Sequence, residues 1–182
     1  MKKVLALLLA AMMLASFVAC SAAPAVQTVN EKELLETVWA SYADDEKFFA
    51  MGGDYNNIVD NAPGACDATD AETLDAMFGF PTANVADIDG AASLMHAMNQ
   101  NTFTAGAYHM VSADKKADLA AAIKENIMNR HWMCGFPDTL IVASVGDCLV
   151  AAFGEASIME TFKTKLTTAY DFAEILYEES LA

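Results

Sequence analysis

The stretch TLIVASVGDCLVAAF, residues 139–153, decides the fold that this chain is expected to adopt. It consists of two apolar runs separated by Gly146-Asp147, and both runs carry residues that favour strands. A two-residue turn that contains glycine, placed between two such runs, is typical of a β-hairpin. The sequence therefore predicts a pair of antiparallel strands over 139–153.

Helices are predicted on both sides of this hairpin along the chain. After it, Ser157 opens a helix whose apolar stripe continues to Leu176. Before it, Asp114 caps a long helix that ends ahead of Gly135 and Pro137. We expect both helices to pack against the sheet that contains the hairpin.

Two more helices are predicted in the N-terminal half. Asn30 with Glu33, and Thr69 with Glu72, have the spacing of a capping box, in which the two side chains satisfy free backbone groups at a helix start. The apolar residues after each pair recur at helical spacing. Between the two helices, residues 51–68 are rich in glycine, asparagine and aspartate, which indicates a loop.

The centre of the chain contains one clear strand and one ambiguous segment. TFTAGAYHMVS, from Thr102, alternates and carries aromatic and β-branched residues, which predicts a strand. Residues 86–98 contain alanine, leucine and methionine, which favour a helix, but a neighbouring strand can also recruit them as a partner. The order of elements indicates an α+β domain over 30–182, in which long helices cover one face of an antiparallel sheet.

Residues 1–19 have the composition of a secretion signal, because two lysines precede an apolar run too short to span a bilayer comfortably. The run ends in Phe17-Val18-Ala19-Cys20, which resembles the box of bacterial lipoprotein signals, although leucine is usual at the first position. In such proteins the cysteine thiol becomes a thioether to diacylglycerol. Cys20 is therefore the predicted lipidation site, and residues 20–29 are the predicted tether.

Ordinary secretion is the alternative. Ala23-Pro24-Ala25 is an A-x-A pattern, and cleavage before Val26 would remove Cys20. The lipid anchor is preferred because the box ends the apolar run directly and a segment of small residues follows. We therefore expect the protein at the extracytoplasmic face of the cell membrane.

The formal net charge of −15, with 19% charged and 55% hydrophobic residues, describes an acidic globular protein. Such a surface repels phosphate backbones, so nucleic-acid binding is not expected. An unknown protein or a cationic ligand remains open as a partner, and a lipidated Cys20 would add the membrane.

The run LDAMFGFPTANVADIDGAASLMHAMNQNTFTAGAYHMVSADKKADLAAAIKENI, with the hairpin and helix that follow, resembles an uncharacterised family of small lipoproteins from clostridia and related Gram-positive bacteria. The resemblance covers about residues 70–178 and rests on pattern, without a catalytic signature. It implies that 86–98 is a strand, which brings the sheet to about four strands in a ββαββα-like order. It also supports lipidation of Cys20. The family has a domain of unknown function, so the resemblance implies no site residues.

Two groups of soft or borderline ligands are candidate metal sites. His131 and Cys134 form an H-x-x-C pair, but Cys66 and Cys148, which could complete a zinc site, do not have a known spacing. A second set suggests Cu(I). With Met98 opposite Phe103 in a hairpin, however, its two histidines face the other side of the sheet from two of its methionines. The members of this second set are Met95, His96, Met98, His109 and Met110.

Oxygen-bearing side chains gather in residues 51–70, and such a loop can hold calcium. The EF-hand spacing is broken because Ile58 stands where a third ligand belongs. Turns and helix caps explain these side chains equally well. They are Asp54, Asn56, Asp60, Asn61, Asp67 and Asp70. No cofactor is predicted.

Once Cys20 is lipidated or removed, three cysteines remain, so at most one disulfide can form within the chain. Cys148 begins an apolar strand and is expected to be a buried thiol. Cys66 and Cys134 lie in loop-like segments and are the preferred pair.

No motif of nucleophilic catalysis is recognisable in the sequence, which lacks G-x-S-x-G. The leading hypothesis is a non-enzymatic lipoprotein that acts as a binding or accessory module. The alternative is a small extracytoplasmic enzyme for wall or peptide substrates, with the 51–70 loop and the corner of His131 and Cys134 as its candidate site. A structural role in envelope assembly is the third hypothesis.

Overall fold

The computed structural model describes residues 26–181, so the predicted signal and Cys20 lie outside the described residues. The helices are α2 (Glu31–Ala40), α3 (Ala71–Phe78), α4 (Lys116–Met128) and α5 (Ala156–Ala169), with the 3-10 turns η2 (Thr82–Asp87) and η3 (Ala113–Lys115). The strands are β1 (Ala50–Gly52), β2 (Val59–Asp60), β3 (Gly64–Cys66), β4 (Ile88–His96), β5 (Phe103–Met110), β6 (Thr139–Val145), β7 (Cys148–Gly154) and β8 (Glu174–Ser180). Within residues 26–181, no helix is both long and apolar enough to cross a membrane.

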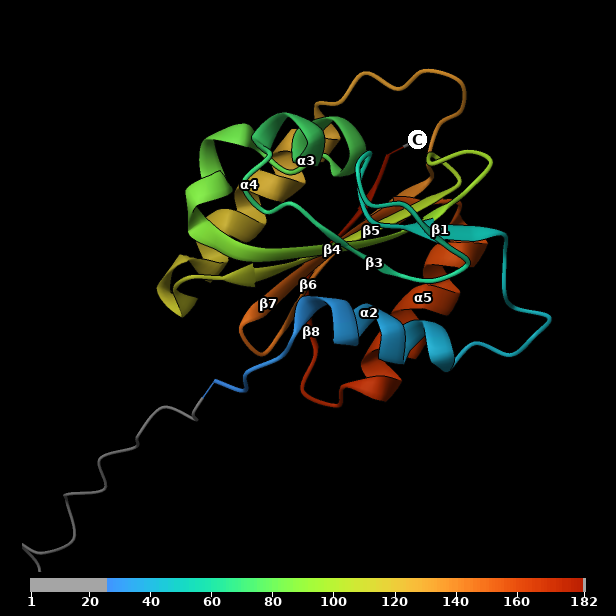
Figure 1. The fold of residues 1–182 in the computed structure, drawn as a ribbon, viewed down its shortest axis with the longest axis horizontal. Coiled ribbons are helices and arrows are strands. Elements are labelled where there is room, and N and C mark those ends of the chain that lie inside the picture. Colours follow the sequence, from blue (N-terminus) through green and yellow to red (C-terminus); the bar gives the residue numbers. More distant parts are fainter. Residues whose placement is uncertain (1–25, 182) are drawn as a thin grey trace, which may run out of the picture.

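The strands form one antiparallel sheet in the order β2-β1-β4-β5-β7-β6-β8, and β3 pairs with β4 beside β1. The hairpin predicted over 139–153 is confirmed, because Val145 pairs with Cys148 across the turn. Helices lie on both faces of the sheet: α2 and α5 cover one face, and α3 and α4 cover the other (Figure 1). The molecule is therefore a three-layer α+β domain.

Each face of the sheet has its own apolar core. On β5, Ala105 and Ala107 belong to the core under α2 and α5, whereas Tyr108 and Met110 belong to the core under α3 and α4. Because successive side chains of a strand point to opposite faces, a strand buried on both sides must be apolar or small at nearly every position. All residues of β7 are buried accordingly.

The predicted α+β class and antiparallel sheet are confirmed, but three details of the fold prediction are wrong. The sheet has eight strands and not about four, helices cover both of its faces, and the helices are short, from 8 to 14 residues. The helix predicted to continue to Leu176 ends at Ala169, and residues 174–180 form the edge strand β8 against β6. The free edge of β6 offers these residues a row of backbone partners that a longer helix would forgo.

Residues 51–68 were expected to form a loop, and the structure instead contains three short strands between residues 50 and 66. Their glycines mark close backbone approach, since a Cβ on Gly52 would lie 2.3 Å from the Gly64 nitrogen. The strand implied for 86–98 is confirmed as β4. Its register with β5 differs by two residues from the expected one, because Met95 pairs with Thr104. A shift of two residues leaves every side chain on its predicted face.

Two of the predicted helix caps lie at or next to the expected residue, but the cap predicted at Asp114 is wrong, because Asp114 lies in the 3-10 turn η3 and α4 has no side-chain cap. Asn30 accepts the backbone N–H groups of Lys32 and Glu33, as expected. At α3 the cap is Asp70, one residue after the predicted Thr69, and its Oδ1 accepts the Thr73 N–H at 3.1 Å. At α5 the first N–H group donates to a distant carboxylate, Asp138, at 2.9 Å.

Truncation of one aromatic ring tests the two-face packing. Phe162 of α5 is fully buried, with its ring centroid 5.2 Å from that of Phe103 on the sheet. We expect Phe162→Ala to lower the free energy of unfolding by about 3–5 kcal/mol, because it leaves a cavity between helix and sheet. Phe172→Ala is the control, because this side chain is 36% exposed. It should lower the free energy of unfolding by less than about 1 kcal/mol. Urea unfolding measures both, and equal losses would contradict the assigned packing.

Candidate functional site

The residues proposed for a zinc site are not brought together. His131 and Cys134 lie in the loop 129–138 that follows α4, Cys66 lies on β3, and Cys148 begins β7. Within residues 26–181 no group of three or more histidine, cysteine, aspartate or glutamate side chains is arranged to hold a metal ion. The Cu(I) candidates are divided as the strand pattern predicts, because Met95 and Met110 belong to the core under α3 and α4.

The described cysteines Cys66, Cys134 and Cys148 are free thiols in the structure, so the predicted disulfide between Cys66 and Cys134 is not formed. Cys66 pairs with Ala91 near the start of β4, whereas the Cys134 carbonyl accepts a hydrogen bond from Asn99, beyond the end of β4. The two cysteines thus lie beside opposite ends of β4, whereas a disulfide needs their Cα atoms within about 7 Å of each other. Burial raises the pKa of the thiols of Cys66 and Cys148 to about 12, so both are held as neutral thiols.

The oxygen-rich loop is organised around Asp54, which is buried. Its Oδ1 accepts the N–H groups of Asn56 and Asn57 at 2.9 and 3.0 Å, and its Oδ2 accepts the Asp67 N–H at 2.7 Å. Asp67 and Asp70 in turn accept hydrogen bonds from Thr69 and Thr73. These carboxylates are thus engaged in closing turns and capping α3, which is the simpler of the two predicted roles.

Arg130 holds the base of the loop 129–138. Its guanidinium donates to the carbonyl oxygens of Asp75 (3.1 Å) and Ala76 at the end of α3, and it lies 5.5 Å from the ring centroid of Trp132. A cation at the carboxyl end of a helix satisfies free carbonyls and the helix dipole. The loop therefore leaves α4 along a fixed path, with Trp132 packed on Phe153.

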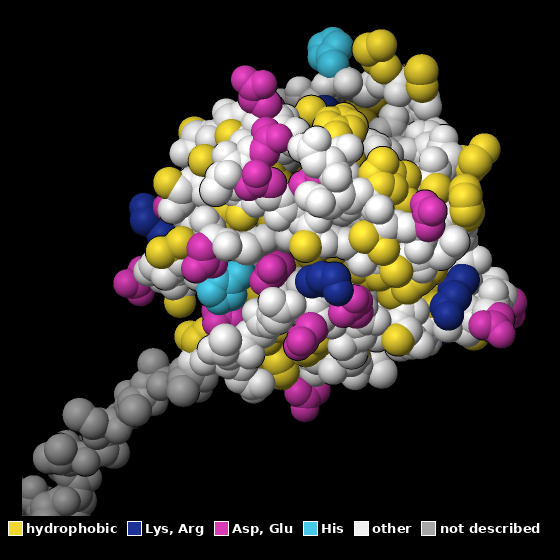
Figure 2. All heavy atoms as spheres, viewed as in Figure 1, with side chains coloured by type: hydrophobic (Ala, Val, Ile, Leu, Met, Phe, Trp, Pro, Cys, Tyr) yellow, Lys and Arg dark blue, Asp and Glu magenta, His cyan; other side chains and the backbone are white. Residues whose placement is uncertain are grey.

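Exposed apolar side chains gather at the end of the sheet where this loop lies. We define the distal loop surface as Phe49, Met98, Met133 and Phe136, whose side chains are between 57% and 77% exposed. Figure 2 shows hydrophobic side chains at the upper right, on the side where the loop 129–138 runs in Figure 1. Large apolar side chains exposed together are a common mark of an interaction surface.

Hydrogen bonds join the three segments that carry the distal loop surface. Asn101 Nδ2 donates to the carbonyl oxygens of Met133 (2.9 Å) and Gly135 (3.1 Å), and Asn99 Nδ2 donates to that of Cys134 at 3.2 Å. On the other side, the Ala97 N–H donates to the Phe49 carbonyl at 2.8 Å. The exposed side chains thus stand on loops whose backbones are fixed to one another.

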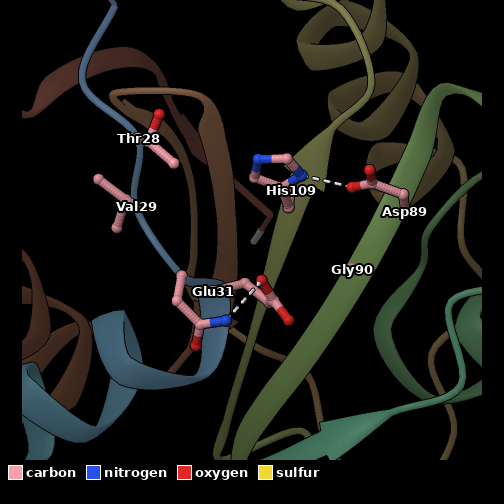
Figure 3. Close-up of a pocket in the computed structure, with 7 residues that line it drawn as sticks. Thr28, Val29, Glu31, Asp89, Gly90 and His109 are labelled. Atoms are coloured by element: carbon pink, nitrogen blue, oxygen red, sulfur yellow. Dashed lines mark hydrogen bonds and ion pairs between the residues drawn. The ribbon is translucent and has the colours of Figure 1, made fainter.

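At the opposite end of the sheet, the start of the described chain forms a shallow hollow of about 340 Å³ against β4 and β5. Figure 3 shows His109 between Thr28 and Val29 on one side and Asp89 on the other, with Glu31 at the start of α2 below it. His109 Nδ1 is paired with Asp89, and its Nε2 lies 3.3 Å from Asp147 Oδ2. The hydrogen bond with Asp89 is the main cause that raises the pKa of His109 above its usual value.

Sequence reasoning missed both of these features. His109 was assigned only to the Cu(I) set, and its carboxylate partners lie 20 and 38 residues away in the chain. Met133 and Phe136 stand among Gly135 and Pro137. In the sequence, the local indication of an exposed apolar surface is that these large apolar residues stand among residues that predict a loop.

Removal of the Asp54 carboxylate tests the assigned role of the 51–70 loop. We expect Asp54→Ala to lower the free energy of unfolding by about 1–3 kcal/mol, because buried N–H groups lose their acceptor. Asp60→Ala, at an exposed position of β2, serves as the matched control and should change stability by less than about 0.5 kcal/mol. Urea unfolding compares the two variants, and a stable Asp54→Ala protein would show that the carboxylate has another task.

Comparison with known proteins finds no relative of this chain. No protein-family model matches the chain, and neither a curated protein nor a solved structure matches it. The resemblance to clostridial lipoproteins therefore stays a prediction, and the function is argued from the geometry of the chain itself.

Proposed function

We propose that this protein is a lipid-anchored, extracytoplasmic binding module that presents the distal loop surface to a partner protein. The observation that carries the proposal is the set of four large apolar side chains held exposed on hydrogen-bonded loops. Exposing them to water costs free energy that burial in a partner would recover. The lipoprotein box at Cys20 supplies the anchor.

The anchor side and the distal loop surface lie at opposite ends of the sheet. His109, beside the start of the described chain, pairs with Cys148, whereas Phe103, beside the loops, pairs with Gly154. Six residues of β5 separate the two ends, which corresponds to ~20 Å at ~3.3 Å per residue. In Figure 1 the start of the described chain (blue) and the loop 129–138 (orange) lie on opposite sides of the molecule.

This separation favours a partner other than the anchoring bilayer. Cys20 and Gln27 are joined by a chain that spans at most ~25 Å when fully extended. For the distal loops to touch the bilayer that holds Cys20, this chain would have to spend about 20 Å of that length passing along the sheet. The anchor side of the domain is therefore nearer to the lipid at Cys20 than the distal loop surface is, which favours a protein partner for that surface.

Charge indicates the chemistry of the partner. The chain as a whole carries a net charge of −15, but residues 97–102 contain no charged side chain and 129–138 contain one arginine and one aspartate. An apolar, nearly neutral centre inside an acidic surround fits a protein surface with an apolar groove and a basic rim. The occupant that we propose is a protein of this kind.

The anchor is tested by metabolic labelling with an alkyne analogue of palmitate. We expect label on the wild-type protein and none on Cys20→Ala, because only the cysteine of the box receives the thioether lipid. Cys134→Ala, which removes an exposed thiol, is the control and should retain the label. An unlabelled wild type, or equal label on Cys20→Ala, would refute lipidation at Cys20.

The distal loop surface is tested by a photo-crosslinking amino acid placed at Phe136 in cells that carry the lipidated protein. We expect a crosslink to one discrete protein. Met133→Ser should abolish it, because this change removes a large apolar side chain that contacts the partner beside Phe136. High salt should weaken it, because the contacts at the rim of the interface are ionic. The same label at Val111, which is 60% exposed at the tether end, is the control and should not give this product.

Other crosslinking products distinguish the remaining occupants. Crosslinks to lipid alone would show that the surface enters a membrane, and a product of twice the chain mass would show a second copy of this chain. Either result would overturn the proposed partner, while the labelling of Cys20 would stand independently.

A further inference from the structure

The tether is fastened to the domain at the β6–β7 turn. The Asp147 N–H donates to the Gln27 carbonyl at 3.0 Å, and Asp147 Oδ1 accepts the Val29 N–H at 2.8 Å. The Cys148 thiol donates to the Val29 carbonyl at 3.1 Å. Gly146 makes this approach possible, since a Cβ there would lie 2.1 Å from the Gln27 oxygen. Residues 27–29 are therefore held by the turn before α2 begins.

One carboxylate links the tether to a titratable group. While Asp147 Oδ1 holds Val29, its Oδ2 lies 3.3 Å from His109 Nε2, and His109 Nδ1 is paired with Asp89. A neutral imidazole has a single N–H, so both nitrogens can donate to carboxylates only when the ring is protonated. The observed arrangement thus fits the imidazolium form.

We propose that His109 is a pH-sensitive clamp, whose imidazolium holds Asp147 where it fastens residues 27–29, and whose deprotonation loosens them. The groups that face His109 come from each element around it. They are Asp89 on β4, Asp147 in the turn, Glu31 on α2 and the Cys148 thiol on the neighbouring strand. The ionisable groups are three carboxylates and a thiol, so this surround favours the charged ring.

The direction of the pH dependence follows from the raised pKa of His109, whose usual value is 6.5. A base with a raised pKa in the folded state stabilises that state fully below its unfolded pKa and loses this contribution as the pH rises through the folded value. The clamp is therefore closed below the raised pKa of His109 and opens as the pH rises through it.

Opening changes how far the domain can move from its anchor. Release of three residues lengthens the tether by up to about 11 Å. This consequence rests on the proposed lipid anchor, whereas the clamp itself involves only residues of the folded domain and can be tested without a lipid.

The test follows two NMR signals of the full chain in detergent micelles over a pH series. The ring carbons of His109 report its ionisation, and the amide exchange of Val29, corrected for the intrinsic rate, reports the fastening of the tether. We expect His109 to titrate above 6.5, and the protection of Val29 to fall about tenfold or more over the same pH range.

Variants separate the clamp from a general loss of structure. Asp89→Asn should lower the pKa of His109 and move the release of Val29 to lower pH, because the main hydrogen-bonding partner loses its charge. His109→Gln should abolish the pH dependence, whereas His131→Gln, at an exposed histidine outside this site, should retain it. The clamp is refuted if Val29 protection does not follow the His109 titration, or if the transition persists in His109→Gln.

Discussion

Burial of the β6–β7 hairpin on both faces is the constraint on which the rest of the structure depends. Every residue of β7 is buried, and both neighbouring strands, β5 and β6, are buried almost completely. A hairpin whose strands are apolar or small at nearly every position cannot leave either face in water. It therefore requires a helical layer on each side, which α2 with α5 and α3 with α4 provide.

This constraint leaves the strand ends as the places where polar and functional groups can gather. The centre of the sheet is filled by apolar and small side chains, such as Ala105, Ala107 and Ala151. At one end, His109 lies among carboxylates beside the tether, and at the other, asparagines join the loops of the distal surface. The site residues of this protein are thus on loops and turns that a rigid sheet positions.

Local sequence patterns predicted much of the fold. They failed where contacts with residues distant in the sequence determine the secondary structure. The hairpin, the cap at Asn30 and the stripe of α4 follow from nearest neighbours in the sequence, and all are present. Leu176 continues the helical spacing of the preceding apolar stripe, yet the open edge of β6 recruits residues 174–180 as a strand. A single apolar stripe also cannot show which face of the sheet a helix will cover, so the packing of helices on both faces could not be predicted from the sequence.

The candidate site was harder to predict because its members meet only in the folded chain. Oxygen and soft ligands grouped by sequence proved to serve turns, caps and cores, as Asp54 and Met95 illustrate. The pairing of His109 with Asp89 and Asp147 depends on the β4–β5 register and on the position of the turn. No local spacing encodes either of these.

A rigid sheet between the two ends has a consequence for how they can communicate. Packed strands transmit little change of shape, since the interior is close-packed and small displacements are resisted. Ionisation of His109 should therefore leave Met133 and Phe136 in place and alter only the length of tether that is free. In such a protein the anchor end would govern where the binding surface can reach, while the surface itself stays constant.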